Sequence, residues 1–188
     1  MTATYADLTG AVLSEVGRAL RSVDASAVAA LRDEIRHARR IFVAGAGRSG
    51  LCVRAFAMRL MQLGLPAHVV GDATTPGLGE ADLLLIGSGS GRTASLVQHA
   101  ARAKSLKARV ALITTATASP LGEHADCSVR LVAPTPKRDD SDGALSIQPM
   151  GSLFEQALSL LLDVVILQLM ADLNVSAEQM FQRHANLE

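Results

Sequence analysis

The fold is decided by residues 41–50, which read IFVAGAGRSG, together with residues 83–93, which read LLLIGSGSGRT. In each stretch an apolar, β-rich run ends in a glycine-rich loop, and a helical pattern follows. Glycine lets the backbone turn sharply and approach a ligand closely, and the amides at a helix start favour anions. Two such loops on parallel strands, the second rich in hydroxyls, predict a pocket built around a phosphate.

Apolar strand-like runs alternate with helical patterns along the rest of the chain, which is typical of a parallel sheet covered on both faces. Two helices are expected before the first loop, with Asp24 or Ser26 able to cap the second. In an open α/β sandwich of this kind, ligands bind outside the carboxyl ends of the strands, where both loops would lie. The expected strands cover residues 41–44, 67–70, 83–86, 110–114 and 128–132. Two later helices are expected, one that follows Ser49 and ends near Gly64, and one from about Arg92 to Leu106.

The length of 188 residues allows one ordinary core and is short for two full domains. We expect a single domain over residues 1–188, with leading helices in 1–39, the sheet with both loops in 40–133, and a C-terminal helix and tail in 150–188. Residues 134–149 hold three prolines and a Lys-Arg-Asp-Asp cluster, which favours a connecting segment over a domain boundary.

Charge and hydropathy argue against nucleic acid and membranes as partners. The formal net charge is zero, with 18 basic and 18 acidic residues, so no overall field attracts the chain to a polyanion. The start of the chain lacks a basic segment followed by an apolar one, and a cytoplasmic location is expected. The apolar stretch over residues 153–173 is interrupted by Glu155, Asp163 and Asp172, which favours a buried or subunit-contact helix.

The two cysteines, Cys52 and Cys127, lie far apart in the sequence, and neither belongs to a CxxC pair or a Cys/His cluster. This spacing favours reduced, buried thiols over a metal site or a disulfide.

The first loop has a second interpretation. Gly45-x-Gly47-x-x-Gly50 satisfies the dinucleotide fingerprint, and Asp72 lies 22 residues beyond Gly50, about where a ribose-binding acid is expected. An NAD site is therefore an alternative, whereas an ordinary turn after a strand would also explain Asp72.

The second loop favours a phosphate over a dinucleotide. Ser88, Ser90 and Thr93 place three hydroxyls within six residues, beside amides that could form an anion-binding concavity. Hydrogen bonds to a charged group contribute about 1.5 to 3 kcal/mol each, so four or five would hold a phosphate firmly. Ordinary turn and helix-capping roles are the alternative for each of these residues.

The two loops resemble those of the SIS (sugar isomerase) domain family. Residues 149–155 (PMGSLFE) and the tail 183–188 (RHANLE) carry the resemblance further, and it covers nearly the whole chain from about residue 40 onward. It implies a flavodoxin-like, five-stranded parallel sheet flanked by helices. Among family members the chain is most similar to isomerases of the ribulose monophosphate pathway. These interconvert D-arabino-hex-3-ulose 6-phosphate and D-fructose 6-phosphate, with no metal or other cofactor.

The resemblance also implies roles for single residues and an assembly. Family members form tetramers with sites between subunits, so a homotetramer is expected here. Arg92 departs from the family pattern, because many relatives carry an acidic residue there. An arginine at this position could add to the attraction of a phosphate, but we expect its side chain to be solvated. Carried over by position, the implied phosphate-binding residues are Gly47, Ser49, Ser88, Gly89, Ser90 and Thr93, and the implied catalytic residues are Glu155 and His184.

The implied reaction moves a carbonyl from C3 to C2 through a 2,3-enediol, so one base can take the proton from C2 and return it to C3. A carboxylate between apolar neighbours, such as Glu155, suits this task, whereas a capping box with Ser152 would be a purely structural role. His184 is the candidate for moving protons between the two oxygens. A sensor that binds the sugar phosphate without converting it is the alternative function, although the first 40 residues look too short and too neutral for a DNA-recognition module.

Overall fold

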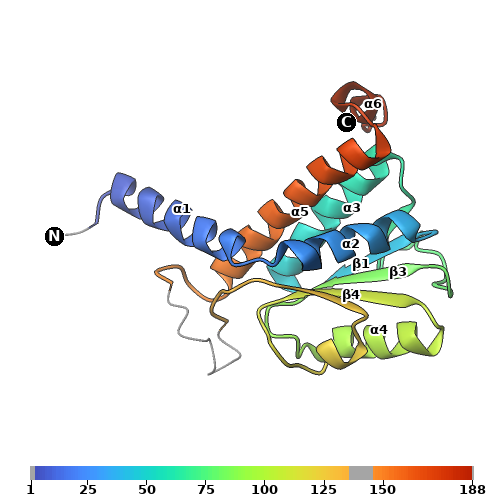
Figure 1. Cartoon of the computed structure of the whole chain (residues 1–188), viewed down its shortest axis with the longest axis horizontal. Helices are drawn as coiled ribbons and strands as arrows, with labels where there is room; N and C mark the ends of the chain where they lie inside the picture. The colour runs from blue at the N-terminus through green and yellow to red at the C-terminus, as the bar shows by residue number, and fades with distance from the viewer. Residues whose placement is uncertain (1–2, 136–145, 188) are drawn as a thin grey trace.

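The computed structural model describes residues 3–135 and 146–187. Its centre is a five-stranded parallel sheet in the order β2-β1-β3-β4-β5 (Figure 1). This is the flavodoxin-like order, and it confirms the predicted fold class. From β1 the chain adds β2 on one side and then crosses to add β3 on the other side. The loops after β1 and β3 therefore lie at the topological switch point. The strands are β1 (Ile41–Gly45), β2 (Ala67–Val69), β3 (Leu83–Gly87), β4 (Arg109–Thr114) and β5 (Cys127–Arg130).

Helices cover the two faces of the sheet unequally (Figure 1). Side chains alternate between the faces along each strand, so Val43 and Leu85 belong to one core cluster whereas Phe42 and Leu84 belong to the other. The first cluster is covered by α1 (Tyr5–Arg21), α2 (Ala25–His37), α3 (Gly47–Leu63) and α5 (Ser152–Leu173). The second is covered by α4 (Ala94–Ser105), beside the short 3-10 helix η1 (Gly122–His124), and α6 (Ala177–Phe181) follows the far end of α5.

Helix boundaries follow local backbone chemistry. Asp24, rather than Ser26, caps α2 and accepts a hydrogen bond from the Ser26 amide at 2.8 Å. The end of α3 at Gly64 is as predicted, because this glycine adopts a left-handed conformation with φ of 92°. Helix α4 begins two residues later than predicted, at Ala94, since the backbone of Thr93 is still extended.

The long apolar helix α5 lies against the rest of the molecule. By length and composition it is the one helix of the described residues that could cross a membrane, yet half of its most apolar window is buried inside the protein. Leu158, Leu162 and Val165 are almost fully buried against the first core cluster. This burial is that of a core helix, as the sequence predicted.

Glu15 ties α1 to the segment that leads into α5. The described chain resumes at Ser146, because residues 136–145 of the predicted connection lie outside the described part. The buried Glu15 carboxylate accepts hydrogen bonds from the Ser146 hydroxyl (2.6 Å), the Ile147 amide (2.9 Å) and the Gln148 side chain (3.0 Å). Burial alone would raise the pKa of Glu15, but these hydrogen bonds hold it below its ordinary value.

Replacing Glu15 by glutamine should therefore destabilise the protein in a pH-dependent way. A carboxylate with a lowered folded-state pKa stabilises the fold above its ordinary pKa of 4.5, and this contribution is lost as the pH falls through the folded-state value. We expect a loss of about 1 kcal/mol at pH 7 that shrinks below about pH 4. Thermal unfolding midpoints at fixed protein concentration, compared with those of the exposed control Glu123→Gln, measure it. A loss of stability that is as large below about pH 4 as it is at pH 7 would contradict this role.

Candidate active site

A cavity of about 480 Å³ opens at the carboxyl edge of the sheet, where both glycine-rich loops lie. The β1 and β3 ends are in register, with Gly45 opposite Gly87, so the two loops leave the sheet side by side. The cavity brings together all six predicted phosphate-binding residues and Glu155. It is lined by Ala46, Gly47, Arg48, Ser49, Gly87, Ser88, Gly89, Ser90, Thr93, Leu96, Thr135, Pro149, Met150, Gly151, Ser152, Phe154 and Glu155.

Three helices begin at this cavity. Gly47 and Ser49 belong to the first turn of α3, Thr93 is the N-cap of α4, and Ser152 is the first residue of α5. Each helix start presents amides without intrahelical partners and the positive end of the helix dipole. Their convergence makes the cavity attractive to an anion, even though the chain carries no net charge.

The loop after β3 is held in place by the end of β4. The Gly89 carbonyl accepts hydrogen bonds from the Thr114 hydroxyl (3.0 Å), the Thr115 hydroxyl (2.9 Å) and the Thr115 amide (3.1 Å). The Ser90 hydroxyl accepts one from the Arg92 amide at 3.3 Å. In the described part of the chain the Thr93 side chain makes no capping hydrogen bond to α4, so its hydroxyl remains available on the cavity wall.

The loop after β1 depends on two glycines in contact. A Cβ on Gly45 would lie 2.8 Å from the Gly50 Cα, and a Cβ on Gly50 would lie 2.7 Å from the Gly45 carbonyl oxygen. Side chains at these positions would push α3 away from β1. The fingerprint-like glycine spacing thus has a packing function here, and it sets the first turn of α3 against the cavity.

Glu155 lies in the first turn of α5 and forms an ion pair with Arg48. Its Oε2 is 2.6 Å from the Arg48 Nε, and its side chain is 17% exposed whereas that of Arg48 is 63% exposed. The capping box considered for Ser152 is not formed, because Gly151 is the N-cap and no side chain caps this end of α5 within the described residues. The Glu155 carboxylate is therefore free of a capping role and faces the cavity.

Neither cysteine competes with Glu155 for chemistry. Both thiols are free; Cys127 is buried, as predicted, whereas Cys52 is only partly buried, and its thiol donates to the Glu155 backbone carbonyl at 3.4 Å. Burial, followed by the negative charge of Glu155, raises the pKa of Cys52, and burial likewise raises the pKa of Cys127. Thiols with raised pKa values stay protonated and are poor nucleophiles.

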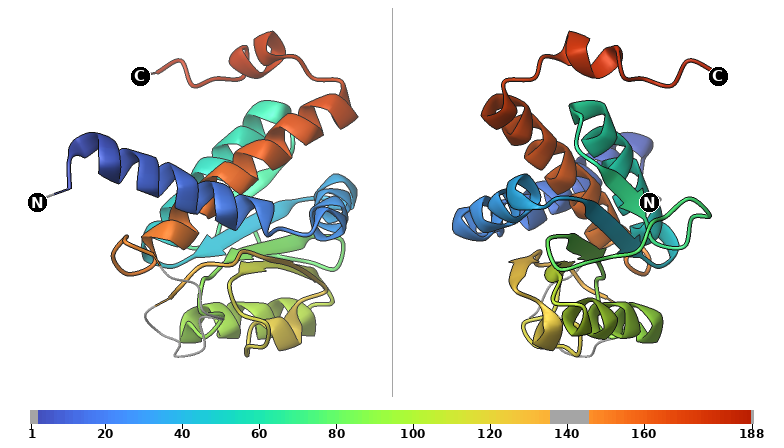
Figure 2. Two further views of the ribbon diagram at one scale, coloured as in Figure 1. Left: turned by 60° about the vertical axis from the view of Figure 1, so that its left-hand side comes forward. Right: turned by 90° about the vertical axis from the view of Figure 1, so that its right-hand side faces the viewer.

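His184 does not share the cavity with Glu155 in the same chain. Arg183 donates to the Gln62 carbonyl at 3.0 Å, which fixes the tail at the end of α3 opposite to its glycine loop. Both views in Figure 2 show α6 and the tail at the far end of α5. Because α5 has 22 residues and Glu155 is in its first turn, the tail lies about 30 Å from the cavity. The exposed His184 ring stacks on Phe181 at 6.0 Å.

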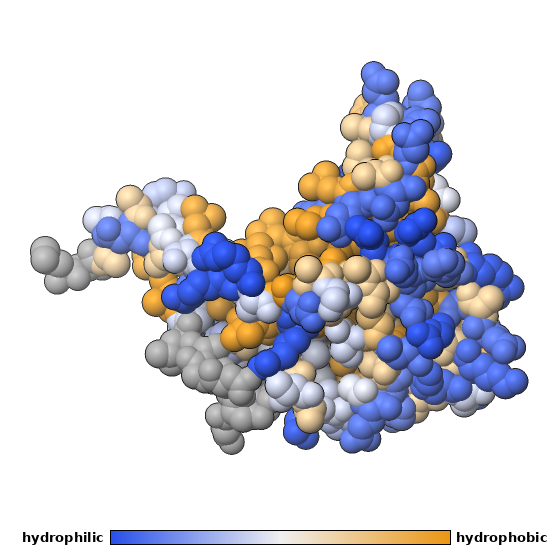
Figure 3. Space-filling model, viewed as in Figure 1, coloured by the Kyte–Doolittle hydropathy of each residue, from blue (hydrophilic) through white to orange (hydrophobic). Residues whose placement is uncertain are grey.

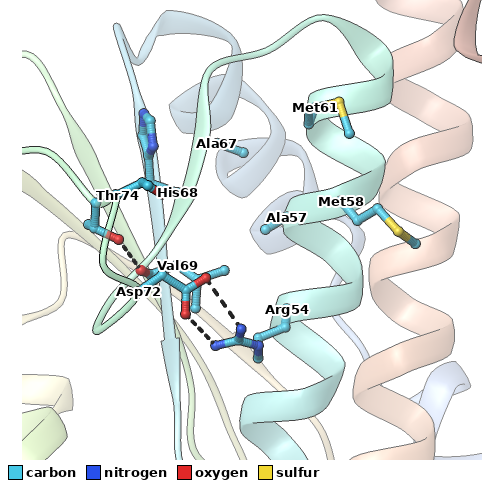
Figure 4. A pocket seen from close by; sticks show the side chains of 10 residues that line it. Arg54, Ala57, Met58, Met61, Ala67, His68, Val69, Asp72 and Thr74 are labelled. Atoms are coloured by element: carbon cyan, nitrogen blue, oxygen red, sulfur yellow. Dashed lines mark hydrogen bonds and ion pairs between the residues drawn. The ribbon is translucent and has the colours of Figure 1, made fainter. Parts of the chain in front are cut away.

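Asp72 lies in a separate cavity of about 280 Å³, between β2 and α3 (Figure 4). Its carboxylate is paired with the Arg54 guanidinium at 2.9 and 3.3 Å, and the two side chains point toward each other across this cavity. An acid already paired in this way is poorly placed to bind a ribose beside the first loop. The geometry therefore does not favour the NAD interpretation.

Comparisons with known proteins agree with this geometry. The SIS domain model matches residues 34–160. The chain belongs to the SIS domain family. It is 48% identical to the 3-hexulose-6-phosphate isomerase of Bacillus subtilis, over 94% of this chain and 95% of that protein. It is 46% identical to the enzyme of the same name from Mycobacterium gastri, over 94% of this chain and 88% of that protein.

A solved SIS-type structure from Methanococcus jannaschii superposes with a TM-score of 0.83, at 34% identity, and covers 96% of this chain and 99% of its own. That protein is described as hypothetical, with an inferred molecular function of 3-hexulose-6-phosphate isomerase. The resemblance seen in the sequence is thus confirmed over the domain, and the expected isomerase class agrees with the relatives' names.

Arg48 is the residue of this SIS site that sequence reasoning left without a role. It stands next to Ser49 in the first loop, and only the fold reveals that it reaches Glu155, which is 107 positions further along the chain. Arg92, in contrast, is exposed and does not line the cavity, in agreement with the solvated side chain that was expected.

Proposed function

We propose that this protein is a 3-hexulose-6-phosphate isomerase, which interconverts D-arabino-hex-3-ulose 6-phosphate and D-fructose 6-phosphate through a 2,3-enediol. The observation that carries the proposal is one cavity in which a partly buried carboxylate, Glu155, lies with the hydroxyl-rich loop after β3. The names of the similar proteins from Bacillus subtilis and Mycobacterium gastri support the same reaction.

The proposed mechanism divides the work between the loops and the carboxylate. Ser49, Ser88, Ser90 and Thr93, with the helix-start amides, bind the phosphate on C6 and orient the sugar. Glu155 then removes the proton from C2 of the 3-ulose, the electrons of that C–H bond form the C2–C3 double bond, and the C3 carbonyl oxygen takes up a proton to give the enediol. Glu155 returns its proton to C3 while the C2 hydroxyl loses its own, which leaves the carbonyl on C2, and His184 is the proposed carrier of protons between the two oxygens. Since the phosphate occupies the C6 oxygen, the 3-ulose cannot close a five-membered ring and needs no ring-opening acid.

The same proposal includes a homotetramer with sites between subunits, in which His184 reaches the cavity of a neighbouring copy. Support comes from the distance between His184 and Glu155 within one chain, and from apolar side chains that a neighbour could cover. Leu160, Val164 and Leu167 on α5 are between 45% and 65% exposed. Apolar residues form a band along α5 in Figure 3. We further propose that the enzyme works in the cytoplasm as a single domain, on a small sugar phosphate.

Replacing both Ser90 and Thr93 by alanine should weaken phosphate recognition. Loss of two hydrogen bonds to a charged group should raise KM and the inhibition constant of a non-reactive sugar phosphate by about 100-fold or more, with a smaller effect on kcat. Inhibition kinetics with a C6-phosphorylated, reduced sugar measure this. Ser128→Ala, an exposed hydroxyl on β5, is the matched control. An unchanged inhibition constant in the double variant would rule out the proposed binding role.

The experiment that tests the function is a coupled assay for fructose 6-phosphate formation by the purified protein. An isomerase produces fructose 6-phosphate continuously, whereas a sensor with the same loops is stabilised by the sugar phosphate against heat without forming product. Stabilisation by NAD rather than by fructose 6-phosphate would instead favour a dinucleotide site.

A further inference from the structure

Two charged side chains from the described residues line the cavity, one basic and one acidic, and they are paired with each other. Among the described residues that line it, Arg48 is the only basic side chain and Glu155 the only acidic one. Their 2.6 Å contact leaves the cavity walls with no unpaired charged side chain. A sugar phosphate therefore meets an arginine that is already engaged by the proposed catalytic base.

The two partners differ in their freedom to move. Arg48 extends from the first turn of α3, and 63% of its side chain is exposed, whereas the Glu155 side chain is 17% exposed. An ion pair with one exposed partner is only modestly stable, so a competing anion can capture the arginine. A phosphate dianion also offers a guanidinium more charge than a carboxylate does, in a geometry that allows two parallel hydrogen bonds.

The pairing also restricts the carboxylate. While the Arg48 Nε donates to Oε2, that oxygen is engaged by a donor that keeps its proton, and the contact fixes the direction in which the carboxylate points. Capture of Arg48 by the phosphate would release Oε2 and let the carboxylate turn toward the sugar at the moment when the sugar is bound.

We propose that Arg48 is a positioning residue that exchanges partners: it caps Glu155 in the empty site and moves to the substrate phosphate on binding, thereby freeing the base. This inference rests on the proposed function. It also predicts a preference for phosphorylated sugars that exceeds what phosphate binding alone supplies, because the phosphate acts on the base as well as on affinity.

The test uses a substrate divided into two pieces, D-fructose without phosphate and the phosphite dianion. Removal of the proton from C3 of fructose, in the reverse direction, is followed as incorporation of deuterium from heavy water by mass spectrometry. For the wild-type enzyme we expect phosphite to accelerate this exchange by about fivefold or more. For Arg48→Gln we expect exchange without phosphite to be about three- to fivefold faster than wild type, because the cap is absent. Added phosphite should change the variant's rate less than twofold.

The same variant should lose about 10- to 100-fold in kcat/KM on fructose 6-phosphate, so its effects on the two substrates have opposite signs. A mere phosphate ligand would leave the phosphate-free rate unchanged, and a structural residue would lower both rates. Arg48→Lys, which keeps the charge, should restore part of the acceleration by phosphite. Arg54→Gln is the matched control, since Arg54 lies on the same helix in an ion pair with Asp72 outside the cavity, and it should behave as wild type.

Three results would overturn the inference: no acceleration of the wild type by phosphite, a phosphate-free rate in Arg48→Gln equal to or below that of wild type, or equal acceleration of both proteins. Thermal midpoints of all variants confirm folding. Failure of the proposed function itself is distinguished beforehand, since it would appear as absent conversion of the phosphorylated 3-ulose by the wild-type protein.

Discussion

Replacing Glu155 by glutamine is expected to lower kcat by about 1000-fold or more, while fructose 6-phosphate still binds. Glutamine keeps the size of the side chain but cannot take a proton from carbon, and a positioned general base contributes roughly 100- to 10,000-fold. The binding loops connect β1 to α3 and β3 to α4 and do not include Glu155, so the loops should keep their shape in this variant. The coupled assay gives kcat, and a thermal shift with fructose 6-phosphate gives binding.

The matched control for this change is Glu123→Gln, an exposed carboxylate in η1 that does not line the cavity. It should retain wild-type kinetics. Near wild-type turnover by Glu155→Gln would show that another group is the base. Loss of binding together with turnover would instead assign Glu155 to substrate recognition.

Replacing His184 by glutamine is expected to lower kcat by about 100-fold or more, although the residue lies far from the cavity of its own chain. The proposed reason is that the ring serves a neighbouring subunit's site. Its control is His37→Gln at the end of α2, whose Nδ1 lies 2.7 Å from the Asp33 carbonyl oxygen, and this variant should stay active.

Mixing the two inactive variants distinguishes a shared site from a site within one chain. If Glu155 and His184 come from different subunits, refolding Glu155→Gln with His184→Gln in equal amounts should restore about a quarter of wild-type activity, since that fraction of sites receives both intact side chains. Each variant refolded alone by the same procedure is the control. A mixture as inactive as its components would show that each site takes both residues from one chain.

Much of the fold could be predicted because it is written in local patterns. Apolar runs of four or five residues followed by glycines define β1 and β3, and side-chain alternation toward two core clusters follows from burial on both faces. Helix α6 was not predicted, although its capping box, in which Ser176 and Gln179 bond each other's backbone amides, was a readable signal. A helix of five residues has too little periodicity to stand out from a tail.

The sequence by itself determined the parallel sheet, the two loops at its carboxyl edge and the hydroxyls that line the cavity, because strand, turn and helix-start preferences act over a few neighbouring residues. Only the tertiary structure decided that Arg48 meets Glu155, that Glu15 holds residues 146–148, and that the tail carrying His184 is fixed to the far end of α3. These contacts join residues more than 100 positions apart, and their partners depend on how helices pack, which no local pattern encodes.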